Sequence, residues 1–143
     1  MGNVAHEALN ILDAPALLKG FERGDKIVDC QIGGDGSKKY CYLTVLRNGN
    51  KLLFTKGFNQ KQILGRIDTH ENDLFFPVIG QTEESSFEKV FLFEEVAFAV
   101  EKDGELVVIG GSLVYPDRSI FPISLGYEHF SIPTRTYLLR VVR

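Results

Sequence analysis

Hydrophobic and polar residues alternate along most of the chain beyond Gly20, which is the pattern of strands that bury one face. Nine such segments are rich in Val, Ile, Tyr and Phe, residues that favour β-strands: 26–32, 39–47, 51–58, 74–79, 88–93, 96–101, 105–111, 119–125 and 136–142. Turn-forming residues separate them at 33–36, 48–49, 103–104 and 116–117. The pattern predicts one all-β domain over residues 1–143, with antiparallel strands from 25 to 143 arranged as a barrel or a sandwich.

The first twenty residues follow a different period. Val4, Ala8, Leu9, Ile11 and Leu12 fall on one face of a helix, and Asp13, Pro15 and Gly20 are suited to begin and end a second short one. We therefore expect a helical segment over 1–20. Residues 83–100 are compatible with either helix or strand, and the alternation of Phe91 with Phe93 and of Phe98 with Val100 favours strands.

Both cysteines flank the glycine cluster 33–36. An evenly paired hairpin centred between Asp35 and Gly36 would place Cys30 opposite Cys41, within reach of a disulfide. Because no secretory signal is evident, we expect two packed thiols. No spacing in the sequence supplies the further ligands that a zinc site needs, so no metal and no cofactor are predicted.

Length and composition narrow the class of protein. The chain has 143 residues, which is typical of a single domain, and its net charge of −3 argues against a dedicated duplex-binding protein. No apolar run approaches the ~20 residues of a membrane span. These features predict a soluble, cytoplasmic protein that does not enter a membrane.

Charge is distributed unevenly beneath that modest total. Residues 19–66 hold ten Lys or Arg against four Asp or Glu, whereas residues 82–105 hold two against eight. Aromatic residues are interspersed in the basic stretch 38–61, and this combination is used to hold single-stranded nucleic acid. The acidic stretch would repel a long polyanion, so nucleic acid is the less favoured partner and complementary contact between subunits the more favoured one.

The segment 66–73, Arg-Ile-Asp-Thr-His-Glu-Asn-Asp, is the densest polar group in the chain. Asp68, His70 and Glu71 carry groups that act in acid–base catalysis or bind a divalent metal. A metal-assisted or acid–base hydrolase centred on them is therefore one alternative. The other interpretation is a solvated loop between two strands, which the composition favours.

Lysine is absent after Lys102, while arginine persists to the C-terminus. Arginine is favoured where a planar group must hold a carboxylate or phosphate, or lie in an interface. The sequence therefore favours a non-catalytic binding module that contacts a protein partner or a small anionic ligand, as a homo-oligomer. The residues expected to make that contact are Arg118, Arg135, Tyr137, Arg140 and Arg143.

Overall fold

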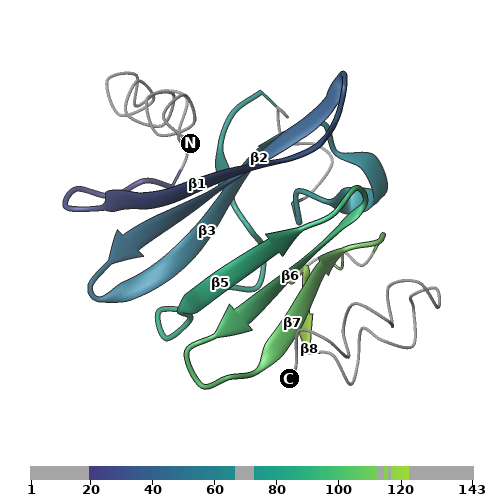
Figure 1. Ribbon diagram of the computed structural model, residues 1–143. Helices are drawn as coiled ribbons and strands as arrows, with labels where there is room; N and C mark the ends of the chain where they lie inside the picture. Colours follow the sequence, from purple (N-terminus) through teal and green to yellow (C-terminus); the bar gives the residue numbers. More distant parts are fainter. Residues whose placement is uncertain (1–19, 67–72, 113–114, 116, 123–143) are drawn as a thin grey trace.

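A computed structural model describes residues 20–66, 73–112, 115 and 117–122 (Figure 1). Residues 1–19 of the helical segment expected over 1–20, and the whole strand expected over 136–142, lie outside these residues. Within the part of the chain that the structure describes, no helix has the length and apolar character that crossing a membrane requires.

The described chain is predominantly β, as the alternating pattern predicted. Four strands form a first antiparallel sheet, sheet 1, in the order β1-β2-β3-β4. Its strands are β1 (Lys26–Asp35), β2 (Lys38–Arg47), β3 (Asn50–Gly57) and the short β4 (Phe76–Pro77). A single 3-10 turn, η2 (Gln60–Gln62), follows β3.

Four later strands form a second antiparallel sheet, sheet 2, in the order β5-β6-β7-β8. They are β5 (Phe87–Leu92), β6 (Val96–Glu101), β7 (Leu106–Gly110) and β8 (Ile120–Pro122). The segment that was compatible with helix or strand thus contains β5 and most of β6. The two sheets are separate, so the described strands form two layers and do not close into a barrel (Figure 1).

One apolar core joins the two sheets. Tyr42 and Leu53 from sheet 1 meet Phe87 and Ile109 on the side of sheet 2, and all four are buried. The hydroxyl of Tyr42 donates a hydrogen bond to the carbonyl of Ile63 at 2.5 Å. Burying the phenol with a partner for its O–H fixes the loop after β3 against the core.

The middle strands of each sheet are buried on both faces, which simple alternation does not predict. On the outer face of sheet 1, Cys30, Leu43 and Phe54 belong to a second apolar cluster, on which Phe21 packs. A third cluster, containing Phe98 and Val108, occupies the outer face of sheet 2. A strand covered on two sides becomes a continuous apolar run, as in β7, where every residue is buried.

The β1–β2 hairpin turns later than the sequence suggested. Its turn is formed by Gly36 and Ser37, and Gly33 and Gly34 are paired within β1. Gly33 is required there because a Cβ atom would lie 2.5 Å from the Tyr40 ring, which covers it from the opposing strand. Glycine is often tolerated inside a strand where another group approaches the backbone closely.

That shift changes the pairing of the cysteines. Cys30 lies opposite Leu43 and Cys41 lies opposite Ile32, so the two cysteines are diagonal neighbours and the prediction of direct opposition is wrong. They nevertheless share the outer face of sheet 1, with their Sγ atoms 3.1 Å apart.

The free edge of β3 is covered by side chains beyond its short pairing with β4. The backbone N–H and C=O of Leu53 both bond to the side-chain amide of Gln81, and the N–H of Lys51 donates to the hydroxyl of Ser86. These groups satisfy the strand as a neighbouring backbone would, and they block pairing with another chain.

Candidate functional site

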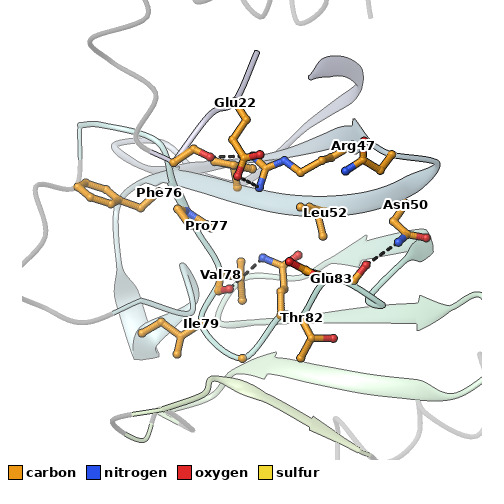
Figure 2. Close-up of a pocket in the computed structure, with 15 residues that line it drawn as sticks. Glu22, Arg47, Asn50, Leu52, Phe76, Pro77, Val78, Ile79, Thr82 and Glu83 are labelled. Carbon is orange, nitrogen blue, oxygen red and sulfur yellow. Dashed lines mark hydrogen bonds and ion pairs between the residues drawn. The ribbon is translucent and has the colours of Figure 1, made fainter. Parts of the chain in front are cut away.

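A cleft of about 780 Å³ opens at the β3 edge of sheet 1, beside the β2–β3 turn and the segment after β4 (Figure 2). The apolar part of its lining comes from six residues: Leu52, Phe54, Phe76, Pro77, Val78 and Ile79. Polar residues of the N-terminal approach to β1, the β2–β3 turn and the segment 80–83 complete it. Small-ligand sites commonly have cavities of this volume, although their linings are usually more apolar than this one.

The cleft is shaped by backbone conformations that the local sequence selects. Asn48 and Gly49 both have positive φ, 51° and 81°, which is the type I′ hairpin turn that an Asn-Gly pair favours. Gly80 has φ of 103°, and a Cβ atom there would lie 2.7 Å from the Cβ of Arg118. The chain can therefore turn away from β4 only with glycine at this position.

Gln81 fixes one wall of the cleft. Its Oε1 accepts a hydrogen bond from the N–H of Leu53 at 2.6 Å, and its Nε2 donates to the carbonyls of Leu53 and Val78, each at 2.9 Å. The Nδ2 of Asn50 donates a hydrogen bond to the carbonyl of Glu83 at 2.6 Å (Figure 2). This bond links the first residue of β3 to segment 80–83. With these amides engaged, the wall is preformed.

Arg47 stands at the rim of the cleft with its charge already compensated. Its Nε and Nη2 bond to the two carboxylate oxygens of Asp25, at 2.9 and 2.6 Å. Its Nη2 also donates to the carbonyl of Gly20 at 2.7 Å, and its Nη1 lies 3.1 Å from Glu22. Burial alone would raise the pKa of Asp25, but the hydrogen bonds from Arg47 and the backbone of Glu22, with the charge of Arg47, lower it below its usual value.

The charge that remains at the rim is therefore negative. Glu22 and Glu83 are both exposed acidic residues that line the cleft, and among the described residues Arg47 is the one cation in its lining. Since that guanidinium is bound to Asp25, the rim offers more hydrogen-bond acceptors than donors. A ligand with an amine, guanidinium or amide N–H suits such a rim better than an anion does.

The structure describes one of the five residues expected to make the contact. Arg118 is exposed, and its guanidinium carbon lies 5.1 Å from the centroid of the Phe121 ring. It packs behind Gly80 and is not among the cleft residues. The other four, Arg135, Tyr137, Arg140 and Arg143, lie outside the described residues, so their role stays a prediction.

The polar segment 66–73 is described only at its two ends. Arg66 is fully buried and its Nη1 donates to the carbonyls of Thr55 and Leu74, at 2.9 and 2.7 Å. Its guanidinium also lies over the Phe76 ring, and burial lowers its pKa to about 10. Arg66 therefore joins β3 to the approach to β4. The hydrolase candidates Asp68, His70 and Glu71 fall outside the described residues, and that alternative stays a prediction.

The aromatic residues of the basic stretch 38–61 are mostly inside the fold. Tyr40, Tyr42 and Phe54 are buried, whereas Phe58 is 43% exposed. Rings that are buried cannot stack on bases. Within the described part of this stretch, the features that still suit nucleic acid are the exposed lysines and one exposed aromatic ring, that of Phe58.

Three acidic residues gather at the β6–β7 turn, where the carboxylate oxygens of Glu101, Asp103 and Glu105 lie within 4.8 Å of one another. Burial raises the pKa of Glu101, and the charges of its two neighbours raise it further. Exposed acidic groups of this kind are common without a bound ion, and no second feature of this turn indicates one.

The cleft was missed at the sequence level because its residues carry no motif. Gln81 and Asn50 are ordinary polar residues beside turns, and their importance comes from long-range contacts with Leu53 and Glu83. Only the Asn48-Gly49 turn was visible as a local signal.

Neither family models, nor curated proteins, nor solved structures gave a match to this chain. Its function is therefore inferred from its own geometry.

Proposed function

We propose that the protein is a non-catalytic binding module whose site is the cleft at the β3 edge. The observation that supports this most directly is the preformed cleft of about 780 Å³, which has both apolar and polar lining residues and whose wall is fixed by Gln81. Its volume lies within the range of roughly 300–1,000 Å³ seen for small-molecule sites.

The ligand class differs from the sequence-based expectation in the sign of its charge. Because Arg47 is bound to Asp25, the rim has little positive charge to offer an anion. Arg47 is shared by the carboxylates of Asp25 and Glu22, so the rim keeps an excess of negative charge, to which Glu83 adds. This charge favours a ligand that pairs an apolar body with an amine or guanidinium. A small amine, or a basic side chain presented by a protein partner, has this chemistry.

Two small probes that share an aromatic body test the proposal. Phenethylamine carries an ammonium, and phenylacetate carries a carboxylate. In amide-resolved NMR titrations, phenethylamine should shift the resonances of Leu52, Val78 and Gln81 in a saturable way. Phenylacetate should shift them much less at the same concentrations.

Charge-neutral variants distinguish binding of the probe in the cleft from its non-specific attraction to acidic residues elsewhere. Replacing Glu22→Gln and Glu83→Gln together should weaken phenethylamine binding several-fold, as expected for rim charges near a bound cation. The matched control is Glu94→Gln, an exposed acidic residue between β5 and β6, at the end of β5 that lies away from segment 80–83, which should leave binding unchanged. Equal shifts with both probes, or no shift at the cleft with either, would remove the proposal.

Self-association is a second candidate function, supported by the way charge divides between the sheets. Residues 26–57 of sheet 1 hold six Lys or Arg and two Asp, while residues 87–110 of sheet 2 hold two Lys and six acidic residues. Among the described residues one ion pair, between Lys51 and Glu88 at 3.4 Å, joins the two. Exposed charges such as those of Lys38 and Lys39 on sheet 1 and Glu94 beside sheet 2 are open to a second copy of the chain.

Sedimentation at low and high salt tests this second candidate. A complementary contact between copies should give a mass above the monomer at low salt, and that mass should fall as salt is added. A monomer at every salt concentration would contradict it.

A further inference from the structure

The two cysteines are placed for reaction with each other. The Sγ atoms of Cys30 and Cys41 are 3.1 Å apart on the outer face of sheet 1, although the residues are diagonal in the β1–β2 register. A disulfide requires about 2.05 Å between the sulfurs. An approach of roughly 1 Å therefore separates the present contact from a bond.

The two sulfurs differ in access. Cys30 is buried at 6% exposure and packs with Leu43 and Phe54, whereas Cys41 is partly exposed. Lys56 lies directly opposite Cys41 on β3, so its side chain is on the same face of the sheet, where its Nζ lies 5.1 Å from the centroid of the Phe75 ring. A cation that approaches a cysteine favours the thiolate, which is the reacting form.

We propose that Cys30 and Cys41 form a reversible intramolecular disulfide, in which Cys41 reacts first with a small disulfide such as oxidised glutathione and Cys30 then resolves the adduct. This site is independent of the cleft and of the ligand proposed for it. It makes the β1–β2 hairpin a reversible modification site on an otherwise preformed sheet.

The exchange balances in two steps. The Cys41 thiolate attacks one sulfur of oxidised glutathione, an S–S bond forms on Cys41, and one glutathione thiolate leaves and takes up a proton. The Cys30 thiolate, having released its proton, then attacks the Cys41 sulfur and displaces the second glutathione thiolate. Two protein thiols lose two electrons and two protons, and one oxidised glutathione becomes two reduced molecules.

The order of attack gives each single variant its own outcome. After equilibration with oxidised glutathione and alkylation of remaining thiols, the intact mass of the wild-type chain should show the loss of two hydrogens and no alkyl group. Cys30→Ser should stop at one glutathione on Cys41. Cys41→Ser should gain glutathione on Cys30 at least ten-fold more slowly, because the remaining sulfur is buried.

The disulfide should also raise the melting temperature of the protein, and its formation should be reversible. Closing the loop between the two cysteines restricts the unfolded chain, so the oxidised wild type should melt several degrees above the reduced protein. Reduced glutathione should restore both thiols. Lys56→Gln, in which the ammonium is replaced and both sulfurs are kept, should slow the first step while the final product stays the same.

Three results would overturn the proposal. They are two glutathione adducts on the wild-type chain, disulfide-linked dimers as the main product, and full alkylation of both thiols after equilibration in oxidised glutathione. Faster reaction of Cys41→Ser than of Cys30→Ser would contradict the proposed order of attack.

Discussion

The substitution Gly65→Ala tests the packing between the loop after β3 and sheet 2. Gly65 has φ of 63°, and a Cβ atom there would lie 2.8 Å from the Cγ2 of Ile109, 2.8 Å from the Oγ of Ser119 and 2.9 Å from the Cγ1 of Val78. The backbone cannot move away freely. Its carbonyl accepts hydrogen bonds from the Oγ of Ser119 at 2.5 Å and from the N–H of Ile79 at 3.0 Å.

The cost of the added methyl group has two parts of known scale. Holding alanine in the left-handed region costs about 1–2 kcal/mol, and overpacking a filled site costs about 1–3 kcal/mol. The narrower unfolded ensemble of alanine offsets about 0.4–1 kcal/mol. We therefore expect the free energy of unfolding to fall by about 3 kcal/mol, a large fraction of the roughly 5–15 kcal/mol that holds a typical domain together.

Gly36→Ala is the matched control. Gly36 also has positive φ, 54°, but a Cβ atom there meets nothing within 4 Å. The conformational terms are shared by the two variants, so the difference between them isolates the overpacking, about 1–3 kcal/mol. Urea unfolding followed by far-ultraviolet circular dichroism measures both, since the chain has no tryptophan. Equal losses in the two variants would refute the close packing around Gly65.

Three further substitutions test single interactions by the same unfolding measurement. Tyr42→Phe should cost about 1–2 kcal/mol, because it removes the buried hydrogen bond to Ile63; an unchanged midpoint would mean that this bond is absent. Asp25→Asn should lower the free energy of unfolding by about 1.5–3 kcal/mol at pH 7, where the carboxylate holds Arg47. The difference in stability between the variant and the wild type should vanish as the pH falls through the lowered pKa of Asp25, because the wild-type carboxylate is then protonated. A difference that stays constant with pH would contradict the ion pair. The pKa of Glu101 is raised in the fold, so its charged form destabilises the protein at any pH above the ordinary pKa of glutamate. Glu101→Gln should therefore stabilise the protein by roughly 0.2–1 kcal/mol at pH 7 and have no effect below pH 4. Destabilisation at pH 7 would contradict this expectation.

The strands could be predicted from the sequence because their signal is local. Alternation and β-favouring residues located β1, β2, β3, β5, β6 and β7 to within a few residues, and Asn48-Gly49 marked its turn. Register could not be read in the same way. The Tyr40 ring covers Gly33, which keeps the glycine inside β1 and moves the turn to Gly36 and Ser37. That contact joins two strands, and no local pattern contains it.

The candidate site could not be predicted because it is made of contacts between distant segments. Gln81 meets Leu53 across 28 positions, and Asn50 meets Glu83 across 33. Each residue is unremarkable by type and by its neighbours. A cleft of this kind exists only after segment 76–83 has been placed against the edge of β3.

The arginines show why charge counted along a sequence differs from charge offered to a ligand. Arg47 is bound to Asp25, Arg66 is buried against backbone carbonyls, and Arg118 lies over the Phe121 ring. Arg47 and Arg66 serve the fold. Arg118, the one described arginine of the region after Lys102 that had suggested anion binding, lies away from the cleft. The acidic residues Glu22 and Glu83 remain exposed at the cleft, so our proposal of a cationic ligand rests on the pairing inside the fold and not on the composition.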